Sequence, residues 1–283
     1  MKKIAWVTDS TVYLDDELRN HPDVFQVPMT IVLDDVEYLD GKDLTAEELY
    51  EKLKAVKTAP KTSQPPVGVF MELYKRLEKD YDIVFSVLIS SKLSGTVASS
   101  VQAEQEVNIP VVTFDSKILT YALTSLLRKG MALAEQGASV DEIKEKLEVI
   151  RESNETYVMI GSLEQLHRSG GRMSGMQFYL GSMLNIKPII SIEDGALNTK
   201  EKVRSDKKAR EKIFDYLRES HDKYGVKEVY ILYGLHKEVA DEWQGQLEAT
   251  FPDIRFLSCP IGAVIGVHAG EHTIGISWNN RDA

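Results

Sequence analysis

Five short polar segments contain the side chains of this sequence that could do chemistry. They offer hydroxyls, backbone N–H groups, one arginine and one histidine, and such groups hold small anions in proteins. Several of the segments follow an apolar run that is typical of a β-strand, and open α/β sheets bind ligands at that edge. The segments therefore indicate a site for a phosphate or a carboxylate. They are Thr8-Asp9-Ser10, Lys61-Thr62-Ser63-Gln64-Pro65, Ser90-Ser91-Lys92-Leu93-Ser94-Gly95-Thr96, Gly170-Gly171-Arg172 and Gly266-Val267-His268.

The segment Ser90–Thr96 carries the strongest physical argument. It follows the apolar run Ile83–Ile89 and precedes a helical pattern. The free N–H groups and the positive end of the helix dipole would face this turn, and such a terminus binds phosphate or carboxylate. Ser94 and Thr96 add hydroxyl donors, and Gly95 lets a ligand approach the backbone closely. The alternative is that Ser94 only caps the helix.

Each of the other candidate residues also has two interpretations. Thr62 lies in a loop that should reach the same sheet edge, or it belongs to an ordinary polar turn. Asp9 is a ligand-binding residue, or it caps backbone N–H groups. His268 orients the Ser94 hydroxyl or shares a ligand proton, or it is a core histidine. Arg172 binds a carboxylate or phosphate on the protein or on a partner, or it is a surface arginine.

Composition narrows the class of protein. The chain has 283 residues, 43% of them hydrophobic and 28% charged, as in soluble globular proteins, and this length is enough for two domains. The formal net charge of -10 argues against general nucleic-acid binding and against docking on anionic membranes. No apolar run approaches the ~20 residues that cross a bilayer, so no membrane insertion is expected.

The expected location is the cytoplasm. The first apolar stretch is short and is interrupted by Asp9, which argues against a signal peptide. The single cysteine, Cys259, permits no internal disulfide and fits a reducing compartment, and before Pro260 it is more typical of a buried residue than of a nucleophile.

Several catalytic signatures are missing from the sequence. There is no Walker loop and no Gly-x-Gly-x-x-Gly motif, and no His/Cys group has metal-ligand spacing. Ser94 is not in a Gly-x-Ser-x-Gly elbow, because Leu93 precedes it and Lys92 occupies the first position. We therefore expect no metal and no cofactor.

The first half of the chain reads as strands alternating with helices, which predicts an open, mostly parallel sheet with flanking helices. The residues 58–66 read as an extended loop, and Asp34-Asp35 suggests a hairpin turn between two strands. Capping-box patterns at Thr45 and Ser139 mark two helix starts. The predicted strands are 4–7, 25–33, 36–39, 83–89 and 111–114, and the predicted helices are 45–54, 67–77, 97–107, 118–134 and 139–150.

The second half predicts a mixed α/β domain. Asp194-Gly195 suits a tight turn between two strands, and the tail 261–278 is rich in glycine and β-branched residues. We place the domain boundary near 150–157 and expect domains at 1–155 and 156–283. The predicted strands are 157–160, 186–192, 196–203, 229–233 and 254–257. One predicted helix follows the first of these strands and ends at 167, and three more span 178–184, 207–220 and 236–249.

Taken together, these motifs resemble the DegV family of bacterial fatty-acid-binding proteins. The matches cover nearly the whole chain, and their order and spacing are specific to the family. Besides the five segments and the Ala5-Trp6-Val7 that precedes the first, they are Asp115-Ser116-Lys117, Leu184-Asn185-Ile186-Lys187-Pro188 and Glu201-Lys202-Val203-Arg204.

The resemblance implies a two-domain α/β fold that holds a long-chain fatty acid. It implies that Thr62, Ser94, the Gly95 amide and His268 hold the carboxylate. In some members the bound acid is presented to a separate fatty acid kinase, which makes an acyl phosphate for phospholipid synthesis. The arginines Arg172 and Arg204 would then lie near the exposed end of the ligand or near the partner.

The chain departs from the family pattern in three places. Lys92 stands where a small residue is common, Ala269-Gly270-Glu271-His272 replaces Thr-Gly-Pro-Gly, and Ser205-Asp206 replaces Gly-Arg after Arg204. The last difference bears on kinase contact more than on lipid binding.

A buried acyl chain fits the energetics. About 15 methylenes at ~0.8 kcal/mol each supply roughly 12 kcal/mol of gross burial, part of which the loss of freedom on binding cancels. The head group must keep its hydrogen bonds, because an unsatisfied buried carboxylate is very costly. The candidates for lining the tail, each of which could instead be plain core, are Leu163, Phe178, Leu180, Met183 and Ile265.

Two other functions are compatible with the anion site. In the first, the protein is an acyl hydrolase or transferase with Ser94 as nucleophile, His268 as base and the Gly95 N–H in an oxyanion hole. The missing elbow and the lack of an acidic partner for His268 weigh against it. In the second, the anion site takes a small phosphorylated metabolite.

Overall fold

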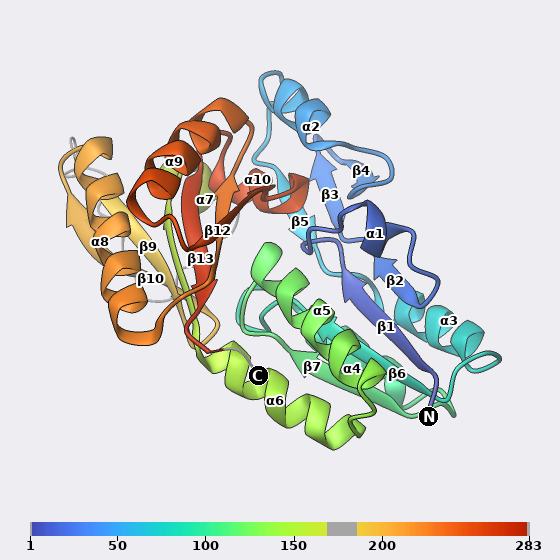
Figure 1. Cartoon of the computed structure of the whole chain (residues 1–283). Coiled ribbons are helices and arrows are strands. Elements are labelled where there is room, and N and C mark those ends of the chain that lie inside the picture. The colour runs from blue at the N-terminus through green and yellow to red at the C-terminus, as the bar shows by residue number, and fades with distance from the viewer. Residues whose placement is uncertain (1, 169–185, 282–283) are drawn as a thin grey trace.

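The computed structural model describes residues 2–168 and 186–281, and in this part of the chain the strands form three sheets (Figure 1). The four-stranded sheet has the order β2-β1-β6-β7, the three-stranded sheet β4-β3-β5, and the six-stranded sheet β10-β9-β8-β13-β11-β12. No helix in the described ranges combines the length and the apolar character needed to cross a membrane.

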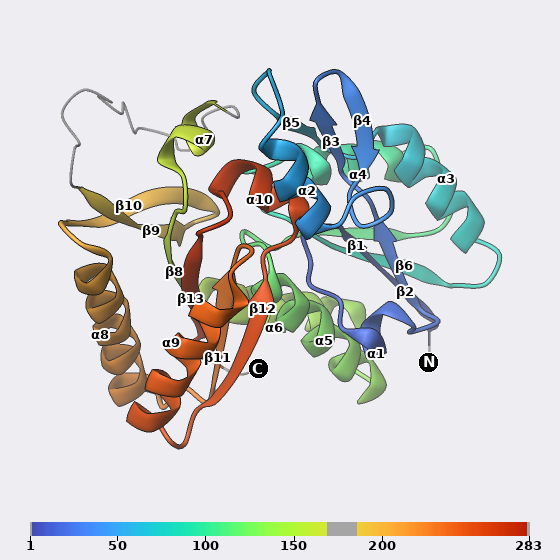
Figure 2. The same cartoon turned by 90° about the horizontal axis from the view of Figure 1, so that it is seen from above.

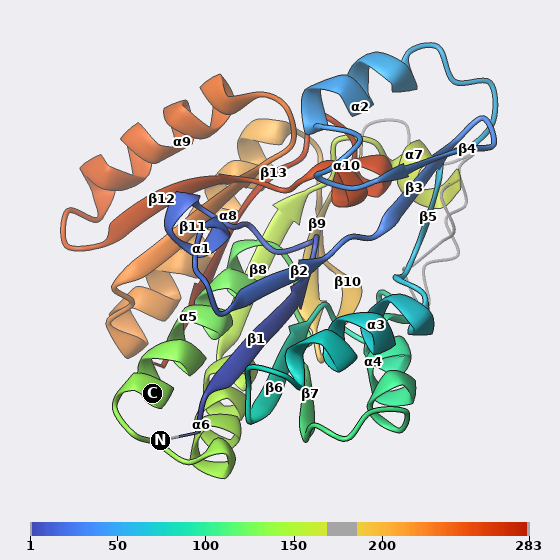
Figure 3. The ribbon, with the colours of Figure 1, turned by 90° about the vertical axis from the view of Figure 1, so that its right-hand side faces the viewer.

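The four-stranded sheet is parallel throughout, as predicted. One of its two inner strands, β6, is buried along its whole length, because helices cover both faces. The helices α5 and α6 lie on one face of this sheet and α3 and α4 on the other (Figure 3). Phe85 packs in one cluster with residues of α5 and α6, while Val84 and Leu88 pack in another with residues of α3 and α4. The strands are β1 (Ile4–Asp9), β2 (Val24–Val27), β6 (Ile83–Leu88) and β7 (Val111–Asp115), and the helices are α1 (Asp16–Arg19), α3 (Val67–Leu77), α4 (Thr96–Glu104), α5 (Tyr121–Glu135) and α6 (Val140–Glu152).

The three-stranded sheet is antiparallel and was only partly predicted. The hairpin between β3 (Thr30–Leu33) and β4 (Val36–Leu39) is confirmed, and Asp34 and Asp35 at its turn have φ of 46° and 64°. The predicted strand 25–33 is wrong as one unit: Pro28 interrupts it, so β2 and β3 belong to different sheets. The expected extended loop contains a strand, β5 (Lys61–Ser63), which pairs with β3.

The six-stranded sheet is mixed, as predicted. β11 and β12 are parallel, and the other pairs are antiparallel. The helices α8 and α9 cover its outer face (Figure 1). The strands are β8 (Asn154–Met159), β9 (Lys187–Glu193), β10 (Ala196–Val203), β11 (Glu228–Tyr233), β12 (Arg255–Pro260) and β13 (Ile274–Asn279), and the helices are α7 (Leu163–Arg168), α8 (Asp206–Tyr224), α9 (Lys237–Thr250) and α10 (Ala263–Ala269).

Helices begin where the sequence predicted when the capping residues lie within the first turn of the helix. Both capping boxes are present: Thr45 begins α2 (Ala46–Leu53), and Ser139 begins α6. The helix predicted from 118 begins only at Tyr121, because Lys117 and Thr120 have φ of 55° and 61°. The helix predicted at 178–184 lies outside the described residues.

The short helix α10 links the parts of the molecule. It lies beside α2 and α7 (Figure 2), and its Val264 and Val267 pack against Met29 and Ile31 in one apolar cluster. The sequence did not predict a helix in this glycine-rich tail. The division into 1–155 and 156–283 stays a prediction; its boundary falls inside β8, and this cluster joins residues from both sides of it.

Candidate functional site

A largely apolar cavity lies where the three sheets approach α10. It contains about 820 Å³ of empty space, counting the part that opens to solvent. Its described apolar lining comes from every layer of the fold. These residues are Met29, Ile89, Leu93, Leu119, Val158, Ile160, Leu166, Ile192, Leu197, Leu232, Ile261, Val264, Ile265 and Ala269.

Three of the predicted site residues line this cavity from separate elements. Thr62 comes from β5, Ser94 from the turn between β6 and α4, and His268 from α10. The Thr62 Oγ1 and the His268 Nε2 are 2.8 Å apart and share a hydrogen bond. All three side chains are half-buried, so their polar atoms meet both the cavity and the protein. The structure therefore brings together groups that the sequence separates widely.

The turn after β6 is held by its own backbone. The N–H groups of Leu93 and Ser94 both donate to the Ser90 carbonyl, at 2.9 and 3.1 Å. The Ser90 hydroxyl donates to the Gly195 carbonyl of the β9–β10 hairpin at 2.7 Å, which fixes the turn against the six-stranded sheet. This anchoring positions Ser94 on the cavity wall.

Ser94 is not the cap of α4. The N-cap is Gly95, which has no side chain to offer, and the Ser94 hydroxyl instead lies 2.8 Å from the Thr96 hydroxyl. The Thr96 N–H reaches the Ser94 Oγ only at 3.4 Å. A Cβ on Gly95 would come 2.8 Å from the Gln64 amide nitrogen, so the β5 loop closes over this glycine. The first N–H groups of α4 thus lie beside the hydroxyls of Ser94 and Thr96.

Asp9 caps backbone N–H groups, which is the structural one of the two roles considered for it. Its carboxylate accepts the Ile89 N–H at 2.7 Å and the Thr11 N–H at 2.9 Å. It is fully buried, and burial raises the pKa of this carboxyl. Asp9 therefore ties the end of β1 to the end of β6 and is not part of the cavity lining.

Asp40, which follows β4, is a buried residue near the site that the sequence did not indicate. Burial raises the pKa of its carboxyl to about 6. Hydrogen bonds from the Ser10 hydroxyl and from the Val264 and Gly41 N–H groups act in the opposite direction and lower this pKa. The contact with Val264 anchors the first turn of α10, the helix that carries His268. A lone Asp in a loop gives no signal of this kind.

The remaining predicted residues have other positions. Arg204 is exposed directly after β10 and does not line the cavity, and Arg172 lies outside the described residues. Of the tail candidates, Ile265 lines the cavity and Leu163 does not, while Phe178, Leu180 and Met183 lie outside the described residues. Most of the lining could not be found from sequence, because its residues are apolar and far apart in the chain.

The site can hold an anionic head group beside a long apolar body. Thr62, Ser94 and His268 supply donors, and the lining around them is apolar. The Ser94 hydroxyl lies beside the Thr96 hydroxyl, and the His268 imidazole lies beside the Thr62 hydroxyl.

The fold and the cavity define a class of α/β protein with a largely apolar cavity between its sheets. The chain belongs to the DegV family: the family model, described as uncharacterised protein, DegV family, matches residues 3–281. A DegV domain-containing protein of Listeria monocytogenes, lmo2514, is 35% identical over 280 residues, which cover 98% of this chain and 99% of that protein.

Two solved structures share the fold closely. The crystal structure of DegV from Bacillus subtilis, described as a fatty acid binding protein, has a TM-score of 0.90 and 34% identity and covers 99% of each chain. A DegV family protein from Thermus thermophilus, described for its fatty acid binding, has a TM-score of 0.89 and 31% identity and covers 98% of this chain and 99% of that one.

Proposed function

We propose that this protein binds a long-chain fatty acid. The Thr62 and Ser94 hydroxyls, the Gly95 amide and His268 hold the carboxylate, and the apolar cavity takes the tail. The observation that carries this proposal is that three of these four residues line one otherwise mostly apolar cavity. The fatty acid binding described for the Bacillus subtilis and Thermus thermophilus proteins supports it.

The division of labour between head and tail follows from energetics. Tail burial supplies roughly 0.8 kcal/mol per methylene and dominates affinity. The hydroxyl, amide and imidazole donors keep the carboxylate hydrogen-bonded, since an unpaired buried charge would cancel that gain. A carboxylate offers these donors two charged acceptor oxygens, whereas an ester or an alcohol offers weaker, uncharged acceptors, so the head-group residues favour an acid.

We further propose that the protein is a carrier rather than an enzyme and that it acts in the cytoplasm. It presents the bound acid to a fatty acid kinase, which forms the acyl phosphate. The motifs described above support this partner, and Arg204 is exposed and accessible to one. In this proposal Arg172 and Arg204 contact the kinase or the phosphoryl group.

Mass spectrometry of an organic extract tests the binding proposal. Protein purified under native conditions should release a long-chain fatty acid in a ratio near one to one, and the stripped protein should take up such an acid on titration. A chromogenic acyl ester should stay intact. Ester turnover that Ser94→Ala abolishes would instead establish the hydrolase, and displacement by phosphate esters but not by fatty acids would establish a metabolite site.

The kinase proposal has a separate test. A fatty acid kinase catalytic subunit supplied with ATP should form acyl phosphate from the loaded protein. Arg172→Ala and Arg204→Ala should lower this turnover while leaving fatty-acid titrations unchanged. Loss of lipid binding in either variant would show that the assignment of that arginine is wrong.

A further inference from the structure

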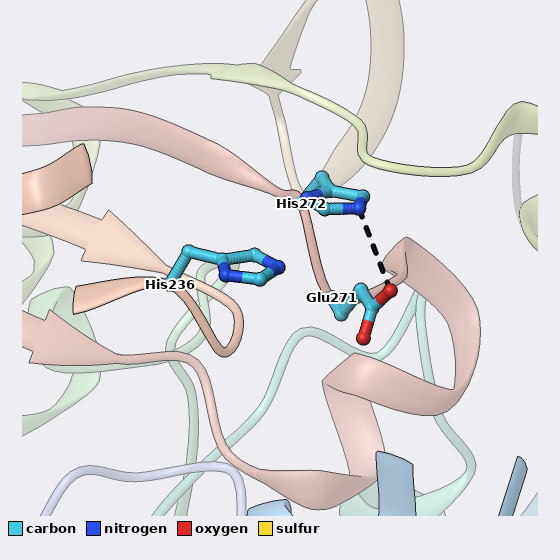
Figure 4. Close-up of side chains that lie close together, drawn as sticks. All are labelled: His236, Glu271 and His272. Atoms are coloured by element: carbon cyan, nitrogen blue, oxygen red, sulfur yellow. Dashed lines mark ion pairs between the residues drawn. The ribbon is translucent and has the colours of Figure 1, made fainter. Parts of the chain in front are cut away.

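Two histidines and a glutamate form a cluster outside the cavity lining. The ligand atoms of His236, Glu271 and His272 all lie within 4.8 Å of one another (Figure 4). His236 follows β11 at the start of α9, and Glu271 and His272 lie between α10 and β13. The two segments are joined by a backbone hydrogen bond of 2.8 Å from the Leu235 N–H to the Glu271 carbonyl. The cluster is thus assembled from distant segments, and its spacing gives no sequence motif.

The two ring nitrogens of His236 have different surroundings in the described part of the chain. Its Nδ1 lies 3.1 Å from the Glu238 carboxylate, which can only accept, so this nitrogen carries the proton. The lone pair is then on Nε2, which is buried and has no hydrogen-bond partner within the described residues. A carboxylate that orients a histidine through its second nitrogen is the usual outer partner in metal sites. A cation at Nε2 would satisfy the unpaired atom.

His272 and Glu271 complete the set of ligands. The His272 Nε2 lies 3.4 Å from the Glu271 carboxylate, and its ring stacks on that of His236 with centroids 4.4 Å apart and planes 6° apart. A metal must lie in the plane of each imidazole that binds it, so one ring has to rotate. The His272 side chain is 66% exposed and is free to make that turn.

We propose that His236, Glu271 and His272 bind a divalent first-row transition metal, with Zn²⁺ the best match. Two imidazole nitrogens and one carboxylate oxygen suit Zn²⁺, and water supplies a fourth ligand. Mg²⁺ and Ca²⁺ prefer all-oxygen sites and fit this set poorly. The ion would join the loop before α9 to the link between α10 and β13.

Zn²⁺ titration of the full chain without a histidine tag tests this site. Protein stripped with a chelator should take up one Zn²⁺ per chain in competition with a chromogenic chelator. His272→Ala and Glu271→Gln should weaken binding at least tenfold, and Glu238→Gln, which removes only the outer carboxylate, should weaken it roughly 10- to 100-fold. His167→Ala, at an exposed histidine of α7, is the matched control and should bind as the parent does.

Co²⁺ provides a readout that simple destabilisation does not mimic. The parent protein should give the strong visible absorption of tetrahedral Co²⁺, and His272→Ala should lose it while keeping its thermal midpoint without metal. Equal Zn²⁺ affinity in the parent and in His272→Ala would overturn the proposal, as would an octahedral Co²⁺ spectrum or equal losses in the His167→Ala control.

Discussion

The Thr62 hydroxyl and the His268 imidazole meet at 2.8 Å, although they are 206 positions apart in the chain. One residue belongs to β5, an exposed edge strand, and the other to α10. Their contact joins the small sheet to the tail of the chain at the cavity wall. The position of each side chain therefore depends on the other, and substitutions at the two residues should have coupled effects on binding.

A double-mutant cycle on this pair tests the unit. Thr62→Val keeps the shape and removes the hydroxyl, and His268→Gln keeps a polar side chain. We expect each variant to weaken fatty-acid binding, and the double variant to lose less than the sum, with a coupling of at least about 0.5 kcal/mol. Isothermal titration of the four proteins gives the coupling directly. Strict additivity would contradict a shared role.

Ser94→Ala should weaken fatty-acid binding by about 1–3 kcal/mol. The reason is that a buried carboxylate would lose one of its few donors. Ser91→Ala is the matched control, since Ser91 lies in the same turn but is exposed and bonds to Asp115. A fatty-acid titration that is the same for Ser94→Ala and the parent would refute the role of this hydroxyl.

Val158→Phe should shorten the cavity and change the preference for chain length. Val158 lies on β8 and lines the cavity, so a larger side chain takes space from the tail. If about three methylenes are excluded, the advantage of hexadecanoic over decanoic acid falls by roughly 2 kcal/mol. Val149→Phe, at an exposed position of α6, should leave the ratio of the two dissociation constants unchanged.

Asp40 should make the stability of the protein depend on pH. Burial raises the pKa of its carboxyl from 3.8 to about 6, so the folded state holds this proton more tightly than the unfolded state does. The associated stability is present below the unfolded pKa and is lost as pH rises through the folded pKa, by up to about 3 kcal/mol.

Asp40→Asn removes that titration. Urea unfolding should show the variant gaining stability relative to the parent as pH rises from about 4 to about 7. Asp222→Asn, at an exposed position of α8, serves as control and should show no comparable gain. A constant difference between Asp40→Asn and the parent over this range would contradict the role of the Asp40 carboxyl.

Two buried tyrosines should respond oppositely to loss of their hydroxyls. The Tyr50 hydroxyl is buried with no hydrogen-bond partner in the described part of the chain, whereas that of Tyr74 bonds to Ser86 and Ser100 at 2.8 and 2.7 Å. Tyr50→Phe should be neutral or stabilising by about 1 kcal/mol, and Tyr74→Phe should destabilise by about 1–2 kcal/mol. Equal destabilisation in urea would mean that Tyr50 has a partner.

The parts of the fold that the sequence predicted are those with local causes. The apolar run of β6 and the capping boxes at Thr45 and Ser139 each fix an element by their own residues. β5 was missed because Lys61–Ser63 is polar and gains its pairing from β3, which is distant in the chain. α10 was missed because its glycine-rich sequence becomes helical through packing against the small sheet.

The residues of the candidate site also fall into those that the sequence indicated and those that it did not. Thr62, Ser94 and His268 could be proposed because polar residues in apolar surroundings are conspicuous, and the structure places them on one cavity, although their ligand contacts stay predictions. The lining residue Leu119 and the anchor Asp40 gave no signal. Their positions depend on backbone turns and on tertiary contacts, which no local pattern specifies.

The cavity wall is built from all three sheets, so a truncated protein could not retain it. Met29 reaches it from the start of the small sheet, Leu93 from the turn after β6 of the parallel sheet, and Leu197 from the mixed sheet. No single layer encloses the space. Excised fragments, even well-folded ones, would present a bare apolar face where the intact chain has an interior.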